Sequence, residues 1–139
     1  MKIDPYLFFE GRCEEAIEHY KSALGAEVQM IMRNSDSPVP PPEGMLPKGS
    51  ENKIMHASLL IKGALIMMSD GGCNGHPAFK GFSISLDCAD EAEARAAFDA
   101  LAVGGQVQMP LSKTFWAPMF GMLADKFGVG WMVIIPQAM

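Results

Sequence analysis

Two stretches of this chain repeat each other, and the repeat constrains the fold more than any single residue does. The tripeptide Val-Gln-Met occurs at residues 28–30 and again at residues 107–109. Each copy follows a short amphipathic segment that ends in glycine, at Gly25 in the first copy and at Gly104-Gly105 in the second. We therefore predict a strand–helix–strand unit that occurs twice. A fold of two such copies typically places its functional site where the copies meet.

The first module, residues 1–70, is predicted to be βαβββ. Residues 3–9 are short, apolar and rich in aromatic side chains, as a buried strand should be. Residues 13–24 are predicted to form a helix, because Cys13, Ala16, Ile17, Tyr20 and Leu24 share one helical face and Gly25 can end the helix. Three strands follow at 27–33, 54–61 and 64–69, and a Lys62-Gly63 turn joins the last two.

The second module, residues 81–139, follows a glycine-rich linker at about 71–80 and repeats the same order. A strand at 82–88 leads to a helix whose capping box is Asp90 and Glu93. The inner face of that helix is predicted to be Ala94, Ala97, Phe98 and Leu101. Strands are predicted at 106–109, within 119–123, and at 131–135. The whole chain is thus one α+β domain, an open, mixed-sheet, barrel-like cup with a helix behind each sheet.

The segment from residue 34 to residue 53 interrupts the first module. It contains five prolines together with Gly44 and Gly49, which prevent regular structure. A connection of this length is long for a compact domain and is often a lid or a partner-binding arm. A mobile surface loop is the other interpretation.

Composition and charge exclude several classes of function. The net charge of −5 and the pI near 5.1 argue against a nucleic-acid partner, which needs a clustered basic face. The sequence has no apolar run long enough for a membrane span and no apolar signal-peptide core near its first residue, so we expect a cytoplasmic protein. Three widely spaced cysteines without a Cys-x-x-Cys pair are predicted to be free thiols. The 12 methionines either fill the core or line an adaptable apolar pocket.

Several motifs resemble the vicinal oxygen chelate superfamily, which includes glyoxalase I, extradiol dioxygenases and bleomycin-resistance proteins. The closest resemblance is to the PhnB-like branch, sometimes labelled a demethylubiquinone methyltransferase domain. The matching segments span nearly the whole chain and are Pro5-Tyr6-Leu7-Phe8-Phe9, Glu15-Ala16-Ile17 with Tyr20, Met55-His56-Ala57, Ser69-Asp70, residues 114–121 (Thr-Phe-Trp-Ala-Pro-Met-Phe-Gly) and residues 125–131 (Asp-Lys-Phe-Gly-Val-Gly-Trp). The resemblance implies the glyoxalase/bleomycin-resistance fold and a homodimer.

The resemblance also raises the question of a metal. Relatives such as glyoxalase I hold a divalent cation with His and Glu side chains from four strands. The corresponding positions here are Asp4 or Tyr6, Met67, Gly81 or Ser83, and Met132. Thioethers are poor ligands for hard or borderline divalent ions. We therefore predict no metal site of the superfamily type and no cofactor. A methyltransferase cleft is also disfavoured, because the chain has no GxGxxG turn after its first strand.

What remains is an apolar pocket with a few polar groups. His56 is the most informative histidine, because it is a titratable group in an otherwise apolar strand, although a purely structural role is also open. The predicted lining is Tyr6, Phe8, His56, Met67, Ser69, Asp70, Trp116, Met119, Phe120 and Met132. Trp116, with Met119 or Phe120, is predicted to close the mouth.

Two functions follow from this pocket. The first is metal-independent binding of a small apolar or amphipathic molecule by a homodimer. The alternative is a glyoxalase-like or dioxygenase-like enzyme, an isomerase or lyase, that uses a divalent metal or His56 as its acid–base group. The second function requires His56 to lie inside the cavity, within reach of Asp70 or a bound ligand, and a position on the helix-packed face would exclude it.

Overall fold

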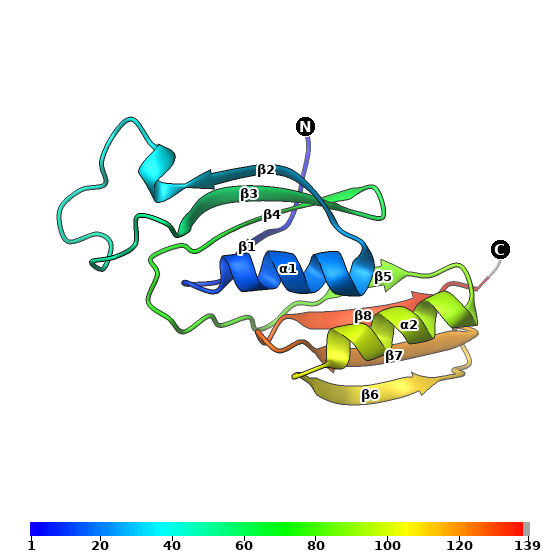
Figure 1. Ribbon diagram of the computed structural model, residues 1–139. Helices are drawn as coiled ribbons and strands as arrows, with labels where there is room; N and C mark the ends of the chain where they lie inside the picture. Colours follow the sequence, from blue (N-terminus) through cyan, green and yellow to red (C-terminus); the bar gives the residue numbers. More distant parts are fainter. Residues whose placement is uncertain (138–139) are drawn as a thin grey trace. The chain divides into compact units, whose positions relative to one another are not determined.

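The computed structural model describes residues 1–137, in which the chain forms two compact units, Met1–Pro77 and Ala78–Met139. The boundary between them falls inside the glycine-rich segment 71–80. Each unit has the predicted order βαβββ (Figure 1). The first unit contains β1 (Tyr6–Phe8), α1 (Cys13–Leu24), β2 (Glu27–Arg33), the 3₁₀ turn η1 (Asn34–Asp36), β3 (Ile54–Ile61) and β4 (Ala64–Ser69). The second contains β5 (Ile84–Asp87), α2 (Glu91–Ala102), β6 (Gln106–Ser112), β7 (Met119–Ala124) and β8 (Gly130–Ile135).

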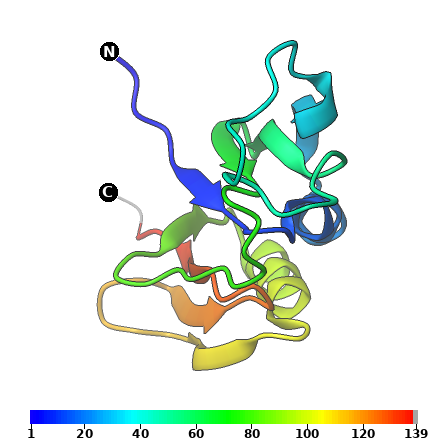
Figure 2. The ribbon, with the colours of Figure 1, turned by 90° about the vertical axis from the view of Figure 1, so that its left-hand side faces the viewer.

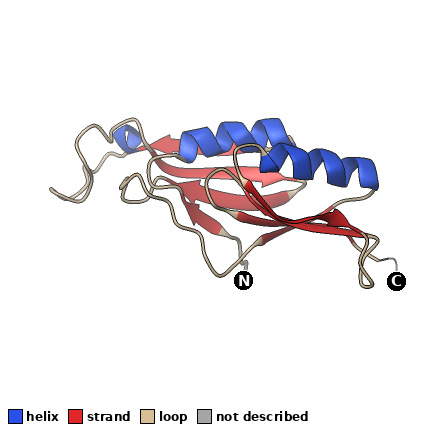
Figure 3. Cartoon of the chain, turned by 90° about the horizontal axis from the view of Figure 1, so that it is seen from below, coloured by secondary structure: helices blue, strands red, loops and turns tan. Residues whose placement is uncertain are grey.

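The two sheets have the same topology. The strand order is β1-β4-β3-β2 in the first unit and β5-β8-β7-β6 in the second. In each sheet the first strand pairs in parallel with the last, and the other pairs are antiparallel. Each helix covers one face of its own sheet, as Figure 3 shows. The fold is therefore α+β with two mixed sheets, as predicted.

The core of the first unit lies between α1 and the sheet. Alternation along the strands brings Leu7, Ala57, Leu59, Ile66 and Met68 to the face that α1 covers, and all five are buried. Cys13, Ala16, Ile17 and Tyr20 of α1 are buried as well, as predicted, whereas Leu24 at the end of the predicted face is only half-buried. Gly25 ends α1 in the left-handed conformation, with φ of 66°.

The second unit repeats this arrangement with different side chains. Trp131, Val133 and Leu123 are buried on the face that α2 covers, together with the predicted inner face of α2: Ala94, Ala97, Phe98 and Leu101. Asp90 caps α2 by accepting a hydrogen bond from the backbone N–H of Glu93 at 2.8 Å. The Glu93 carboxylate accepts from the backbone N–H of Ala89 at 3.4 Å.

The repeated Val-Gln-Met tripeptide forms the same irregularity in both units. The ladder between β2 and β3 shifts register between Val28 and Met30, and the ladder between β6 and β7 shifts between Val107 and Met109. Such a bulge adds one residue to the strand and increases its local twist. The sequence repeat is thus a structural repeat, and it lies on the edge strand of each sheet.

Some predicted boundaries were wrong. The strand predicted at 82–88 is shorter, Ile84–Asp87. The strand predicted at 106–109 continues to Ser112 and passes through Pro110. Proline is tolerated there because β6 is an edge strand, whose outward N–H groups need no partner in the sheet, and the register shifts again between Met109 and Ser112.

Residues 37–53 run as turns and loop beyond the ends of β2 and β3 (Figures 1 and 2). The predicted absence of regular structure in residues 34–53 is confirmed for residues 37–53, whereas Asn34–Asp36 form the 3₁₀ turn η1. Within residues 1–137, no helix is both long and apolar enough to cross a membrane.

Candidate functional site

The face of each sheet away from its helix, which we call the open face, carries one row of side chains across four strands. In the first unit the row is Tyr6, Met67, Ser58 and Met30, in the order β1-β4-β3-β2. In the second unit the equivalent row is Ser85, Met132, Met122 and Met109, in the order β5-β8-β7-β6. The ladder register therefore pairs each residue of one unit with a counterpart in the other, and Met67 is the counterpart of Met132.

The first unit concentrates hydrogen-bonding side chains on its open face. The Tyr6 hydroxyl lies 3.0 Å from Nδ1 of His56, and the Ser58 hydroxyl lies 3.4 Å from Nε2 of the same ring. Tyr6 also packs against Phe8, with ring centroids 4.9 Å apart. His56 and Ser58 are two residues apart on β3, so they point to the same face. His56 thus lies away from α1, so the enzymatic interpretation is not excluded, but its hydrogen-bond partners are Tyr6 and Ser58 and not Asp70.

A cavity of about 570 Å³ opens on the same face next to this group. One wall is the chain segment before β1, from Lys2 to Pro5, and the opposite walls come from β2, β3 and β4. Ser58 is part of the lining, and Asp4 forms an ion pair with Lys2 at 3.5 Å. The remaining lining residues are Gln29, Met30, Leu60, Gly63, Ala64 and Leu65.

Two of the predicted site residues in this unit, Asp70 and Ser69, accept hydrogen bonds from backbone N–H groups. Asp70 is 1% exposed, and its Oδ1 accepts hydrogen bonds from the backbone N–H groups of Gly11 at 3.0 Å and Cys13 at 2.7 Å. Its Oδ2 accepts from the N–H of Ile54 at 2.7 Å. Ser69 is also buried, and its hydroxyl accepts from the N–H of Gly71 at 3.1 Å. This geometry gives Asp70 a structural role, and a ligand-orienting role for either residue stays a prediction.

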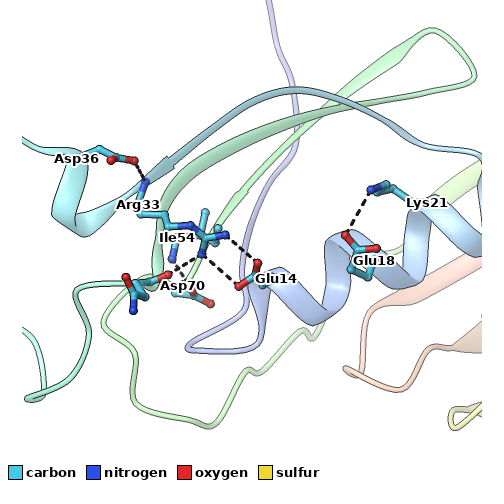
Figure 4. A network of polar contacts seen from close by, with 8 residues as sticks. Glu14, Glu18, Lys21, Arg33, Asp36, Ile54 and Asp70 are labelled. Atoms are coloured by element: carbon cyan, nitrogen blue, oxygen red, sulfur yellow. Dashed lines mark hydrogen bonds and ion pairs between the residues drawn. The ribbon is translucent and has the colours of Figure 1, made fainter.

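Figure 4 shows how this carboxylate and a neighbouring ion pair hold the base of the proline-rich segment. Arg33, at the end of β2, donates two hydrogen bonds to Glu14 of α1, at 3.1 and 2.7 Å. It also donates to the carbonyl oxygen of Asn52 at 2.7 Å. The hydrogen bond from Arg33 lowers the pKa of Glu14. A hollow of about 270 Å³ lies within the segment itself, lined in part by Pro41, Pro42 and Leu46.

The aromatic residues predicted to close a mouth belong to the second unit. Trp116 is 45% exposed and packs edge-on against Phe120 with centroids 5.5 Å apart, and Phe115 packs on Trp116 in turn. Phe120 lies on the open face, two residues before Met122. Met119 alternates with Phe120 and is buried on the same face as Leu123, which α2 covers. Of the two alternatives, the register therefore favours Phe120 as the partner of Trp116.

The resemblance implies metal-ligand positions on the first, fourth, fifth and last strands, and the ladder register shows which residues stand opposite each other there. Tyr6 lies opposite Met67, and Ser85 lies opposite Met132, whereas Gly81 and Ser83 precede β5. The set that these pairings bring together is Tyr6, Met67, Ser85 and Met132. It offers two thioethers, a phenol and a hydroxyl, and lacks the imidazole and carboxylate ligands that borderline and hard divalent ions prefer. These residues do not fit such an ion. Among residues 1–137, no group of three or more His, Cys, Asp or Glu side chains is placed to hold a metal.

Two cysteines are poorly suited to act as nucleophiles. Burial raises the pKa of the Cys13 thiol far above its ordinary value, and the nearby Asp70 carboxylate raises it further. Burial also raises the pKa of Cys73. Because the thiolate is the reactive form, both side chains are held in their unreactive state near neutral pH.

Sequence reasoning missed Ser58, Met30, Leu60 and the role of the segment from Lys2 to Pro5 as a cavity wall, since Asp4 was considered only as a metal-ligand position. Ser58 carried a usable signal, because it follows His56 by two residues in a predicted strand and so shares its face. The segment before β1 carried no such signal, since its position over the sheet depends on tertiary packing alone.

Comparison with known proteins agrees with this architecture. The family model described as 3-demethylubiquinone-9 3-methyltransferase matches residues 1–134. Protein YjdN of Escherichia coli strain K12 is 39% identical over 140 residues, which cover 96% of this chain and 94% of that protein. The crystal structure of protein PA1353 from Pseudomonas aeruginosa is 42% identical, covers 99% of both chains and superposes with a TM-score of 0.84.

Two further solved structures are similar to this chain in fold. A Bacillus cereus protein described as a putative 3-demethylubiquinone-9 3-methyltransferase, PhnB protein, is 31% identical with a TM-score of 0.79, and covers 97% of this chain and 99% of that one. The fosfomycin resistance protein FosX from Listeria monocytogenes shares the fold alone, at 10% identity and a TM-score of 0.65, over 99% of this chain and 93% of that one. The chain therefore belongs to the PhnB-like family described as 3-demethylubiquinone-9 3-methyltransferase, within the glyoxalase/bleomycin-resistance fold.

Proposed function

We propose that this chain binds a small apolar or amphipathic molecule on the open faces of its sheets, without a divalent metal of the superfamily type. The observation that carries the proposal is the equivalence of Met67 and Met132, which puts thioethers at matching positions in both units. Methionine side chains are flexible and polarizable, so they suit an apolar ligand and adapt to its shape.

The proposed site combines apolar walls with few polar groups, as small-molecule sites generally do. In the first unit, Tyr6, Phe8 and Met67 supply apolar surface, and His56 and Ser58 supply hydrogen-bonding groups. In the second unit the proposed lining is Met132, Phe120 and Trp116. The family description names a methyltransferase, but the only glycine between β1 and α1 is Gly11, so the glycine-rich turn of a dinucleotide-type cofactor site is missing from the sequence.

Calorimetric titration tests the metal-independent part of the proposal. The full chain, first treated with a chelator, is titrated with Mg²⁺, Mn²⁺, Ni²⁺ and Zn²⁺ in turn. We expect no stoichiometric binding tighter than about millimolar, because the donor set is wrong for these ions. Stoichiometric micromolar binding that is lost in Asp4→Asn or Met67→Leu would overturn the proposal.

Methyl NMR tests the binding part. The methionine methyl groups are labelled with ¹³C and assigned by single Met→Leu variants, and the amphipathic fluorophore 1-anilinonaphthalene-8-sulfonate is the probe. We expect the probe to shift the open-face signals, above all Met30 and Met67. Met68, buried under α1, and Met45, in the proline-rich segment, are the internal controls. Shifts confined to Met45 would count against a site on the open face.

A second function is favoured by the hydrogen-bonded chain Tyr6–His56–Ser58. An imidazole held between two hydroxyls on a cavity-bearing face is suited to move a proton between carbon and oxygen, as an isomerase or lyase requires. Incubation with the hemithioacetal of methylglyoxal and glutathione in D₂O tests it. Deuterium at the α-carbon that disappears with His56→Gln supports this function, and no incorporation above the buffer rate argues against it.

A further inference from the structure

Ser58 is the one hydroxyl of the open face that meets both a cavity and an imidazole. It lines the cavity of about 570 Å³, and its oxygen lies 3.4 Å from Nε2 of His56. Ser58 is half-buried in the middle of β3, between the neighbouring strands β2 and β4, so rigid secondary structure positions it.

We infer that Ser58 is a nucleophile that accepts the acyl group of a small apolar ester, with His56 as its general base and Tyr6 as the residue that orients His56. The inference rests on the proposed function, since it names the class of molecule that the open face of the first unit would take. A nucleophile within reach of a base, with the base oriented by a third group, is the recurrent arrangement of hydroxyl nucleophiles in enzymes.

The geometry requires one tautomer of His56. If Nδ1–H donates to the Tyr6 oxygen at 3.0 Å, then Nε2 is left to accept the proton of the Ser58 hydroxyl. Tyr6 is thus a positioning residue, which selects the tautomer and does not touch the substrate. Its role parallels that of the buried acid in a hydrolase triad, although a neutral phenol stabilises an imidazolium less than a carboxylate does.

The cavity lining points to the class of substrate. The residues that line the cavity are mostly apolar and include Ile3, Met30, Leu60 and Leu65. An apolar acyl chain suits these walls. Lys2 and Gln29 belong to the same lining and carry donors for a developing oxyanion, and Lys2 would have to exchange its ion pair with Asp4, another lining residue, for that contact. An ester of a short or medium apolar carboxylic acid fits this combination.

The reaction has two balanced halves. Ser58 Oγ attacks the ester carbonyl, its proton passes to Nε2 of His56, and the bond from the acyl carbon to the leaving oxygen breaks as His56 returns the proton to the departing alkoxide. The products are an alcohol and an acyl-serine. Water then repeats the sequence, releasing the carboxylic acid and restoring the Ser58 hydroxyl. No oxidant, reductant or metal takes part.

Mass spectrometry of the intact chain tests the inference directly. The full chain is incubated with p-nitrophenyl butyrate and, separately, with an alkyl fluorophosphonate, which traps activated serines. We expect a single adduct per chain, mapped by peptide analysis to Ser58. Ser58→Ala should abolish the adduct, and His56→Ala should slow its formation by about 100-fold or more, the usual contribution of a general base.

The matched control is Ser112→Ala, because Ser112 is a strand serine whose ladder partner is Phe120, the counterpart of His56. This variant should react like the parent chain. Long-range ¹H–¹⁵N spectra provide a readout for Tyr6 that a packing role would not move: Tyr6→Phe should shift His56 from the Nδ1–H tautomer toward the Nε2–H tautomer.

Two results would overturn the inference: no adduct at Ser58 in a folded chain, or adduct formation at the same rate in His56→Ala. Either result leaves the proposed binding function testable on its own. The methyl shifts caused by 1-anilinonaphthalene-8-sulfonate do not depend on the Ser58 hydroxyl and should persist in Ser58→Ala.

Discussion

Ser58 and Met122 occupy equivalent positions in the two sheets, yet one is a hydroxyl beside an imidazole and the other a thioether flanked by thioethers. The position of His56 is taken in the second unit by Phe120, and that of Tyr6 by Ser85. The backbone ladders are nearly the same, including the bulge at each Val-Gln-Met. The two units therefore share one backbone arrangement but differ in the side chains of their open faces. The hydrogen-bonded group Tyr6, His56 and Ser58 lies in the first unit.

The buried aspartates differ in the same way. Each unit has one that directly follows a strand and accepts three hydrogen bonds, Asp70 after β4 and Asp125 after β7. The donors to Asp70 belong to three separate segments, at Gly11, Cys13 and Ile54. The donors to Asp125 lie within six residues of it, at Phe127, Val129 and the indole of Trp131. Asp70 therefore joins three segments that are far apart in the chain, whereas Asp125 stabilises the single connection between β7 and β8.

The largest effect is expected when Asp70 is removed. Asp70→Ala leaves the N–H groups of Cys13 and Ile54 buried without an acceptor, and we expect a loss of about 4 kcal/mol in the free energy of unfolding. Asp125→Ala should cost less: its donors Phe127, Val129 and Trp131 are also buried, but they lie in one short connection that can shift as a unit.

Urea denaturation of both variants measures this difference, with Asp99→Ala, an exposed helical position, as the control for loss of a charge. Equal costs for the two aspartates would mean that the long-range contacts of Asp70 add nothing to its hydrogen bonds.

Exchanging the side chains at one equivalent position tests how specialised each open face is. Phe120→His puts an imidazole at a 6% exposed site and disturbs the contact with Trp116, for an expected cost of about 2–3 kcal/mol. His56→Phe should cost less than about 1 kcal/mol, since the Tyr6 hydroxyl is only half-buried and can bond to water.

Thermal unfolding of the two single variants and the double exchange checks this asymmetry. If His56→Phe proved the more damaging change, His56 would be chiefly a structural residue, and the acid–base and acylation roles proposed for it would lose their main support.

Local signals explain what the sequence predicted. The bounds of α1, β3 and β4 came out as predicted, because a glycine, a periodic apolar face or a two-residue turn marks each of them within a few residues. The face of His56 followed from alternation in the same way. Each of these features depends on residues that are close together in the sequence, so a single sequence is enough to predict it.

The features that were missed depend on distant pairing. Ser85, and not Gly81 or Ser83, stands opposite Met132, and only the parallel pairing of β5 with β8 decides that. The backbone hydrogen bonds that Asp70 accepts were not predicted, because their donors come from segments far apart in the chain. The strand predicted to end at Met109 continues through Pro110, because β6 is an edge strand. Register and edge position are tertiary properties.

A smaller effect on stability is expected at the residue that follows Gly25 in the first unit and Gly104 in the second. Gly25 and Gly104 are equivalent and have φ of 66° and 74°, but the next residue is Ala26 in one unit and Gly105 in the other. A Cβ on Gly105 would overlap the Ala124 carbonyl oxygen and lie 2.8 Å from the carbonyl carbon of Asp125. Gly105→Ala should therefore cost about 1–3 kcal/mol, because backbone must move.

The reverse change, Ala26→Gly, should cost about 0.5–1 kcal/mol through the greater freedom of the unfolded chain. Denaturant midpoints of the two variants make the comparison. A neutral Gly105→Ala would show that β7 lies farther from this turn than the structure places it.

The smallest effect is expected from Glu14, which joins α1 to β2 in the first unit through Arg33. The hydrogen bond from Arg33 holds the pKa of Glu14 in the folded chain below its ordinary value of 4.5. A carboxyl whose pKa is lowered by folding adds stability that is present above the unfolded pKa and is lost as the pH falls through the folded pKa. Glu14→Gln should therefore lower the melting temperature by about 2 °C or less at pH 7, since the pair is largely exposed.

The difference between Glu14→Gln and the parent chain should shrink as the pH is lowered from 6 to 3, as Glu14 becomes protonated in the parent. Melting curves across that range measure it, with Glu15→Gln as control, because Glu15 shares the first turn of α1 but pairs with Arg12, the residue just before the helix. If the two variants behaved alike, the contribution of Glu14 would come from its place at the helix N-terminus. The link to β2, and with it the anchoring of the proline-rich segment through Asn52, would then carry no stability of its own.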